Sequence, residues 1–361
     1  MMQRLVRWPT LSWLESAKVS SGRRRIVYRG PLSGSRLQLH YGFDGWQEPI
    51  HDVDFEVSER GTAVAQVEGL AGHVSLECAI TDGHEWDNNA GLDYRLWIDF
   101  DALDSHLHVS GRGSGQLGLR SFLIAADSAG MRGGIVSWPE HRLLDRLALS
   151  EAGLWPLVWV RPGETKRSEL RLRLASGFVG IKLHPTGDDY RADDPALDPY
   201  IDIAAEMGVP VACHSAPGDA DPDHIRRLAE RFPSVPVILY HTYLGPREGR
   251  VRAMRHAMEQ PNLLLETSWC GWRDVLAFVD RVGAQRVLFG SDAVADGHSH
   301  YLRDPPNVEG RETYNQGLVA LVRALGPADA RKVMSDNTRR VFGLDIDLAA
   351  NGWPETRSRS A

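Results

Sequence analysis

Apolar and polar residues alternate along much of the first hundred positions. Between about residues 24 and 100, apolar side chains recur at every second position, and Gly-rich or Asp-rich turns separate these runs. The runs include Leu37, Leu39 and Tyr41, then Val53, Phe55 and Val57, and then Val74, Leu76, Cys78 and Ile80. A period of two is typical of strands that bury one face. We therefore expect a small antiparallel β-sandwich in this stretch.

After about residue 101, short runs that are apolar throughout alternate with helical stretches. Runs of this kind suit strands buried on both faces, as in a parallel sheet. The candidate strands lie at about residues 102–108, 133–138, 155–161, 178–184, 209–214, 235–241, 262–267 and 286–291. Helical stretches include residues 167–176, 195–207, 221–232, 247–258 and 272–281. Eight βα units fit one (β/α)8 barrel. A doubly wound open sheet is the alternative, but no Gly-rich phosphate turn follows the first strand.

The two patterns define the expected domains. The boundaries are residues 1–23 for a loosely ordered N-terminal lead-in, 24–100 for the β-sandwich, 101–345 for the barrel and 346–361 for a polar tail. Residues 97–104 run almost directly from the sandwich into the first barrel strand, so the linker is very short. The expected fold class is α/β, a TIM barrel preceded by a small antiparallel β-sandwich.

Side chains that bind metal ions stand at the ends of several predicted strands. They are His106, His108, Lys182, His214, His241 and Asp292. The strands of a (β/α)8 barrel all end on one face, so residues far apart in sequence meet there. His106 and His108 also point to the same side of their strand. One such histidine alone is well explained as a loop cap or a core residue. Together, these residues predict a divalent-metal site, with zinc the usual ion where nitrogen ligands dominate.

The same residues stand in motifs that resemble the amidohydrolase superfamily of metal-dependent hydrolases. The resemblance covers residues 101–344 and is strongest to the amidohydrolase family 2 type, which includes lactonases and decarboxylases. It is carried by Asp-Ser-His106-Leu-His108, Gly-Ile-Lys182-Leu-His184-Pro, Pro-Val-Ala-Cys-His214, Tyr-His241-Thr, Phe-Gly-Ser-Asp292 and Asn337-Thr-Arg-Arg-Val-Phe-Gly343.

This resemblance implies a role for each ligand. His106 and His108 would bind a metal ion from the first strand and His214 from the fifth. Asp292 would bind it from the eighth strand and would also carry the proton of the attacking water. His241 would bind a second ion in a two-metal enzyme, or be a catalytic acid or electrophile in a one-metal enzyme.

Lys182 decides between these two cases. In two-metal relatives, a lysine at the end of the fourth strand is carboxylated and bridges the ions. One-metal relatives have an unmodified lysine or another residue nearby. The sequence leaves open whether one or two ions bind and whether Lys182 is carboxylated. It also does not separate zinc from manganese or iron.

Further residues at the strand ends are candidates for binding substrate. His184 lies on the same side of its strand as Lys182, and could line the pocket or cap the loop before Pro185. Trp269 and Trp272 follow the seventh strand, and could form an aromatic wall or pack in the core. Weaker candidates are Arg161, Thr242 and Glu266. Buried structural pairing accounts for these three equally well.

The ligand set determines the expected chemistry. A bound divalent cation lowers the pKa of a coordinated water and polarises a carbonyl group. A carboxylate beside that water can accept its proton and return it to the leaving group. We expect hydrolysis of an amide, a lactone or an ester. Non-oxidative decarboxylation is the alternative, because related enzymes use the same metal site for it. A barrel that has lost catalysis and only binds carbohydrate is a second alternative.

The first domain resembles starch-binding modules of carbohydrate-binding family 25. The resemblance covers about residues 24–100, and its most specific part is Trp86-Asp-Asn-Asn89-x-Gly-x-Asp-Tyr94. It implies that aromatic rings stack on glucose units while amides bind hydroxyl groups. The residues it assigns are His40, Trp46, Trp86, Asn88 and Asn89. The pattern also allows tryptophans packed inside an inherited fold, or a β-subdomain built from both chain ends. Such a subdomain needs a C-terminal β contribution, for which residues 345–361 are too short and polar.

Composition narrows the expected partners. The net charge of −7 gives no reason to expect nucleic acid or an anionic membrane. The chain has 3 cysteines without CxxC spacing, and neither a signal-length apolar stretch nor a membrane span. We expect a cytoplasmic protein with reduced thiols. Its expected partners are a small-molecule substrate and, less directly, an α-glucan or other carbohydrate; homo-oligomer formation is left open.

Overall fold

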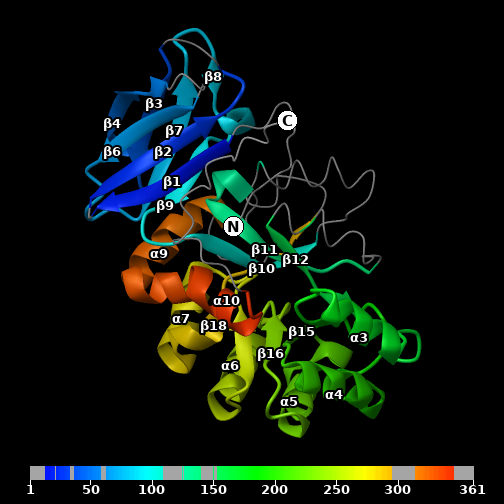
Figure 1. The fold of residues 1–361 in the computed structure, drawn as a ribbon. Coiled ribbons are helices and arrows are strands. Elements are labelled where there is room, and N and C mark those ends of the chain that lie inside the picture. The colour runs from blue at the N-terminus through cyan, green and yellow to red at the C-terminus, as the bar shows by residue number, and fades with distance from the viewer. Residues whose placement is uncertain are drawn as a thin grey trace, which may run out of the picture.

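The structure is a computed structural model of an antiparallel β part and an α/β part (Figure 1). It describes residues 13–20, 22–32, 36–57, 62–108, 124, 126–139, 149, 153–294 and 314–344. The predicted polar tail, residues 346–361, lies outside these ranges. Among the described residues, no helix is long and apolar enough to cross a membrane.

The β part consists of two antiparallel sheets. The first has the order β1 (Trp13–Ser20), β2 (Arg23–Arg29), β6 (Ala63–Glu68) and β5 (Glu56–Val57). The second has the order β4 (Gln47–Asp54), β3 (Gln38–Phe43), β7 (Ser75–Thr81) and β8 (Trp86–Asp87), and β9 (Tyr94–Trp97) also pairs with β7. Residues from both sheets, among them Ile26, Leu39 and Leu76, form one buried cluster. This arrangement is compatible with the predicted β-sandwich.

The lead-in predicted for residues 1–23 is wrong for part of its length. Residues 13–20 form β1, which pairs with β2 from Trp13 opposite Arg29 to Ser20 opposite Arg23, with a register shift between Lys18 and Ser20. The alternation of apolar residues is weak in β1, so its backbone pairing has no clear sign in the sequence. Within the described residues, both sheets are built from strands between residues 13 and 97, without a contribution from the C-terminal side.

The α/β part contains two parallel sheets. One has the order β12 (Leu154–Pro156), β11 (Met131–Val136), β10 (Ala102–His108) and β19 (Ala293–Val294). The other runs in sequence order through β13 (Val158–Trp159), β14 (Ile181–Leu183), β15 (Val211–His214), β16 (Val237–Tyr240), β17 (Leu263–Glu266) and β18 (Val287–Leu288). The order of these strands never reverses, so it differs from that of a doubly wound sheet.

Helices connect these strands where helical spacing predicts them. They are α3 (Arg167–Ala175), α4 (Asp198–Met207), α5 (Pro222–Arg231), α6 (Arg247–Glu259) and α7 (Trp272–Val282). Two helices that the sequence analysis did not predict, α9 (Tyr314–Arg331) and α10 (Asn337–Val341), follow the last strand. Local signals set their ends: Asp221 caps the first turn of α5, and Gly208 ends α4 with a φ of 65°.

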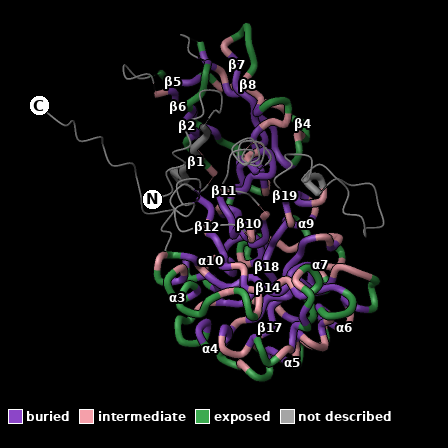
Figure 2. Tube along the Cα trace, turned by 90° about the vertical axis from the view of Figure 1, so that its right-hand side faces the viewer, coloured by how far each residue is buried: buried purple, intermediate pink, exposed green. Residues whose placement is uncertain are grey.

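Apolar residues cover both faces of the parallel strands, as their uninterrupted apolar runs predict. One cluster joins strand residues such as Val136 and Val211 to helix residues such as Ile225 and Phe278. A second cluster contains the opposite face of the strands, with Leu103, Ile135, Leu157, Ala212, Ile238, Leu264 and Leu288. Buried segments accordingly run through the middle of the α/β part, with exposed segments on the outer helices (Figure 2). All three cysteines are free and buried.

Candidate metal centre

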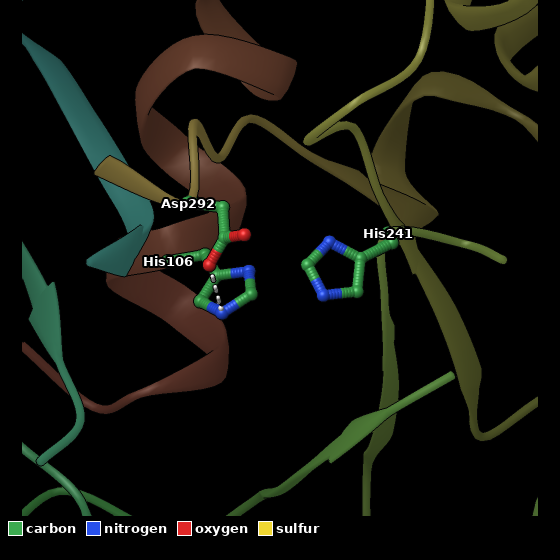
Figure 3. A group of neighbouring side chains, drawn as sticks. All are labelled: His106, His241 and Asp292. Carbon is green, nitrogen blue, oxygen red and sulfur yellow. Dashed lines mark ion pairs between the residues drawn. The ribbon is translucent and has the colours of Figure 1, made fainter. Parts of the chain in front are cut away.

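Three candidate ligand atoms converge beside β10. His106 Nε2 lies 3.1 Å from His108 Nε2 and 3.2 Å from Asp292 Oδ1. His108 Nε2 lies 3.1 Å from the same Asp292 oxygen. Figure 3 shows His106 and Asp292 side by side, with the ring of His241 facing them from the other side. The structure thus brings Asp292 to two histidines that lie 184 and 186 residues earlier in the sequence, as the strand-end pattern predicts.

An irregularity in β10 helps to aim these side chains. The pairing of β10 with β11 shifts register between Asp104 and Leu107. Asp104 Oδ1 accepts hydrogen bonds from the N–H groups of His106 (2.9 Å) and Ser291 (3.1 Å). Asp292 has a left-handed φ of 59°, and its N–H donates to the carbonyl of His106 at 2.9 Å. Bulges and left-handed residues of this kind are common at functional sites.

The neighbours of His106 and His108 determine which ring nitrogen is available to a metal ion. His108 Nδ1 lies 3.0 Å from the carbonyl of Ser137, which can only accept, so this nitrogen carries the proton. His106 Nδ1 lies 3.2 Å from Glu266 Oε2 and is assigned in the same way. The lone pairs of both Nε2 atoms are then directed toward Asp292 Oδ1.

Burial and charge keep His106 and Asp292 in the states that a cation requires. Burial holds the pKa of His106 well below its usual range, so the imidazole is neutral. For Asp292, burial raises the pKa, but the nearby imidazoles of His106, His241 and His108 outweigh it and hold the pKa well below its usual range. The neutral His106 imidazole therefore faces a carboxylate.

These donors fit a divalent metal ion. Tetrahedral coordination with bonds of about 2.0–2.2 Å separates its ligands by roughly 3.3–3.6 Å. The separations of 3.1–3.2 Å are close to that range. Candidate ligand atoms of His106, His241 and Asp292 also lie within 4.8 Å of one another. The chemistry and spacing of the donors agree with the predicted metal site.

His214 and His241 form a second pair of nitrogens. His214 Nδ1 lies 3.1 Å from His241 Nε2, and His241 Nδ1 lies 2.8 Å from Ser268 Oγ. The Ser268 hydroxyl donates to Glu266 Oε2 at 2.7 Å, so it accepts from a protonated His241 Nδ1. The lone pair of His241 Nε2 therefore faces His214. Burial lowers the pKa of His241 to about 3 and also lowers that of His214 strongly.

Lys182 is fully buried beside the first group of ligands. Its Nζ lies 3.5 Å from His106 Nε2 and 4.0 Å from the ring centroid of Tyr240. Burial lowers the pKa of this ammonium to about 8. Tyr240 also stacks on His106, with ring centroids 3.7 Å apart, and its hydroxyl donates to the carbonyl of Ser105. Tyr240 is a neighbour of the site that the sequence pattern did not single out.

His184 takes part in an aromatic stack. Its ring lies between those of Trp159 (centroids 5.4 Å apart) and His214 (4.2 Å apart), nearly parallel to both. Its Nδ1 accepts the N–H of Gly187 at 3.0 Å, which is a loop-capping contact. Burial lowers the pKa of His184 to about 4. The loop cap predicted for this residue is present, and its role in lining a substrate pocket stays a prediction.

The two tryptophans after β17 occupy different places. Trp269 Nε1 donates to Asp292 Oδ2 at 2.6 Å, which fixes the second oxygen of the candidate ligand. Trp272 is the first residue of α7 and packs against the main hydrophobic cluster, close to Gly317 of α9. Of the predicted aromatic wall, the structure brings only Trp269 to the ligands by a described contact. A role for either residue in binding substrate stays a prediction.

The weaker candidates from the sequence bind other protein groups. Thr242 donates to the carbonyl of Glu266, and Arg161 pairs with Asp188. Glu266 is fully buried. Burial raises its pKa, and the hydrogen bonds that it accepts from His241 and Ser268 act in the opposite direction and favour the carboxylate. Its carboxylate accepts hydrogen bonds around His106 and His241, so the prediction of substrate contact by Glu266 is replaced by contact with two ligand residues. Its position after three leucines is the only sign of this in the sequence.

Three of the residues predicted to bind carbohydrate lie close together in the β part, and the binding itself stays a prediction. The ring of His40 lies 5.5 Å from those of Trp46 and Trp86, and Trp86 is 54% exposed. Asn88 uses its side chain to accept the N–H of Gly91. Asn89 does not fit the prediction: it is buried, and its amide nitrogen donates to the carbonyls of Asp93 and Ile124. Asn89 stabilises a turn, and its amide is turned away from solvent.

Comparison with known families agrees with this site. Residues 139–344 match the sequence profile of the Amidohydro_2 family, described as Amidohydrolase. The match covers more than half of the chain, and the chain therefore belongs to the amidohydrolase family. Enzymes of this superfamily depend on divalent metal ions. The matched range does not include the β part.

Curated relatives match over a shorter stretch. A dihydroorotase of Pseudomonas fluorescens is 34% identical over 98 residues, which are 22% of this chain and 28% of the relative. A dihydroorotase of Pseudomonas aeruginosa is 30% identical over 105 residues, or 24% and 30% of the two chains. The chain thus spans less than a third of the length of these relatives.

Solved structures support the fold. An uncharacterised TIM-barrel protein from Bordetella bronchiseptica has a TM-score of 0.50 at 19% identity, covering 68% of this chain and 99% of that one. A putative 2-pyrone-4,6-dicarboxylic acid hydrolase from Pseudomonas putida has a TM-score of 0.51 at 18% identity, covering 69% and 100%. At these identities the similarity concerns the fold alone.

Proposed function

We propose that this protein is a metal-dependent hydrolase that cleaves an amide, lactone or ester bond of a small molecule. The observation that carries the proposal is the convergence of the His106, His108 and Asp292 donor atoms within 3.1–3.2 Å of one another. His214 and His241 complete the ligand set on the opposite side. Zinc is the ion proposed, because four imidazoles and one carboxylate make a nitrogen-rich site. Lys182 would bridge a second ion only if it is carboxylated.

We infer that the two parallel sheets belong to one closed eight-stranded barrel. Two segments support this, because each continues from one sheet into the other. Residues 154–159 carry β12 and β13, with Leu157 donating to Val136 and Val158 donating to Gly180. Residues 287–294 carry β18 and β19, and here Ser105 donates to Phe289. The barrel domain would then extend over about residues 101–345, with the β part as a separate domain.

In the proposed reaction, a bound divalent ion supplies an acidified water and a polarised carbonyl. His106 and His108 present their Nε2 atoms, because their Nδ1 atoms face the acceptor oxygens of Glu266 and Ser137. Asp292, whose Oδ2 is held by Trp269, accepts the proton of the attacking water at its carboxylate and returns it to the leaving group. His241 either contributes to binding of a second ion or polarises the substrate.

The test is elemental analysis of purified protein together with assays on Asp292→Asn. We expect about one zinc per chain for the simple site, and about two if Lys182 bridges. Loss of the carboxylate should lower turnover about 10²–10⁴-fold while metal content is retained. The names of relatives suggest dihydroorotate and 2-pyrone-4,6-dicarboxylic acid as first compounds. Unchanged turnover in Asp292→Asn would exclude this residue as proton carrier, and release of CO₂ without hydrolysis would favour the decarboxylase alternative.

We also propose that the β part binds an α-glucan or a related carbohydrate. The support is the cluster of His40, Trp46 and Trp86, in which one indole is exposed, since aromatic rings stack on the C–H faces of sugars. Retention of the whole chain on amylose tests this. Trp86→Ala should abolish retention, while Leu172→Ala, which truncates an equally exposed apolar residue on α3, should not. No retention of the wild-type chain means that the β part is only structural.

A further inference from the structure

Glu266 is a buried carboxylate between the two groups of candidate ligands. It lies at the end of β17 and is inaccessible to solvent. Its Oε2 accepts hydrogen bonds from the N–H of His241 (2.8 Å), the hydroxyl of Ser268 (2.7 Å) and Nδ1 of His106 (3.2 Å). Its Oε1 accepts the N–H of Ser268 at 2.5 Å. One side chain thus contacts residues from both halves of the centre.

Each of these contacts constrains a ligand. Because a carboxylate oxygen accepts, His106 presents a protonated Nδ1 to Glu266 and keeps the lone pair on Nε2. His241 has a left-handed φ of 68°, a conformation that β-carbon sterics disfavour, and its N–H is bound by Glu266. The Ser268 hydroxyl, which donates to Glu266, accepts from Nδ1 of His241 at 2.8 Å and so orients the His241 ring. Glu266 therefore sets both the ring orientation of one ligand and the backbone of another.

Gly290 provides the room for this carboxylate. A Cβ atom at position 290 would overlap Glu266 Oε1 and lie 2.9 Å from the Cβ of His106. The two atoms that such a Cβ would approach, Glu266 Oε1 and His106 Cβ, thus belong to Glu266 itself and to a ligand that it contacts. Gly290 has no positive φ that would call for glycine, so the close approach of Glu266 and His106 is the reason that any larger residue is excluded here.

We infer that Glu266 is the positioning residue of the metal centre, acting through His106 and His241 and not by contact with substrate. This inference rests on the proposed metal-dependent function. Groups that hold the second nitrogen of a metal-binding imidazole contribute to metal affinity because they fix its tautomer and orientation.

The test is zinc titration of the metal-free full-length chain against a chelating indicator. Glu266→Gln keeps the shape of the side chain but replaces one acceptor oxygen with a donor. It should weaken zinc binding about 10–100-fold. In the zinc-saturated variant, KM should stay within about twofold of wild type while kcat falls, because no substrate contact is lost. Zinc affinity equal to wild type in a folded Glu266→Gln protein would overturn the inference.

Matched variants separate positioning from general damage. Glu77 is another buried glutamate, paired with Arg95 in the β part, and Glu77→Gln should leave zinc affinity within about twofold. Gly290→Ala should weaken zinc binding, whereas Gly317→Ala, where a Cβ meets only ordinary contact, should not. If Glu266→Gln does not fold, Gly290→Ala and Ser268→Ala decide, and wild-type affinity in both would refute the inference. If the wild-type chain itself binds no zinc, the proposed function fails instead.

Discussion

Single neighbouring groups fix the tautomers of several imidazoles in and beside the candidate centre. Ser137 and Glu266 accept from Nδ1 of His108 and His106 and leave their Nε2 atoms free. The N–H of Gly187 instead occupies Nδ1 of His184, whose Nε2 then carries the proton. The sequence predicts where the histidines lie, because the ends of parallel strands meet on one face. It cannot predict these tautomers, since the deciding partners are backbone atoms or a glutamate on a strand far along the chain.

His184 gives the folded protein a specific dependence on pH. Its pKa is about 4 in the folded chain because of burial, compared with an ordinary value of about 6.5 when unfolded. Between these values the unfolded chain binds more protons, so the stability is fully present above about pH 6.5 and falls as the pH decreases toward 4. Urea unfolding of the metal-free chain between about pH 7 and pH 5 should show this decrease.

The variant His184→Gln removes this contribution. The free energy of unfolding should then fall less steeply as the pH decreases, by an amount that corresponds to the uptake of up to one proton. The matched control is His84→Gln, at an exposed position of the β part, which should leave the pH dependence unchanged. Equal slopes for the two variants would show that His184 does not remain neutral in the folded chain.

At the scale of elements, β10 shows where the periodicity of a strand fails. Leu103 belongs to the second hydrophobic cluster, which lies on the face of the strands opposite the helices. A strict period of two would place residues 105 and 107 on that same face. Leu107 instead belongs to the helix-facing cluster, and His106 and His108 approach Asp292. The register shift after Asp104 accounts for the change. The sequence predicts correctly that the two histidines share a face, but not which face the rest of the strand presents.

Element boundaries depend on capping groups, and α5 offers a test. Asp221 accepts the N–H of Asp223 at 3.0 Å and pairs with Arg252 of α6 at 2.6 Å. Asp221→Ala should lower the free energy of unfolding by about 1–2 kcal/mol, because it removes the cap and the ion pair. Asp221→Ser keeps a capping oxygen and should cost less than about 1 kcal/mol. Denaturant unfolding measures both, and equal losses would contradict a capping role.

At the scale of the whole molecule, hydrogen bonds from side chains connect the β part to the α/β part. Arg323 of α9 donates to Asp44 at 2.6 Å, Trp97 donates to the carbonyl of Ala129, and Asn89 donates to that of Ile124. Figure 1 shows α9 directly beside the β strands. The sequence predicts the two parts and the short linker between them. It does not predict these contacts, because Asp44 and Arg323 are 279 residues apart.

Asp44 is the most constrained of these residues. Its buried carboxylate accepts the N–H groups of Val74 and Ser75 as well as the Arg323 guanidinium, and the backbone and side-chain hydrogen bonds outweigh burial to keep its pKa low. Asp44→Ala should reduce the free energy of unfolding by about 3 kcal/mol, because buried donors lose their acceptor.

The matched control for Asp44→Ala is Asp52→Ala. Asp52 is an exposed carboxylate that pairs with His40, and its loss should cost less than about 1 kcal/mol. Denaturant unfolding followed by tryptophan fluorescence measures both. If the two variants are equally stable, the contact between the two parts contributes little.

Because all three cysteines are buried, the folded chain should be unreactive toward thiol reagents. Burial raises the pKa of the Cys213 thiol to about 12 and raises those of Cys78 and Cys270 further, so almost no thiolate is available at neutral pH. A single cysteine introduced on the surface would then accept a maleimide fluorophore with little background. Conversely, reaction of the wild-type chain with such a dye would report the moment at which either part opens.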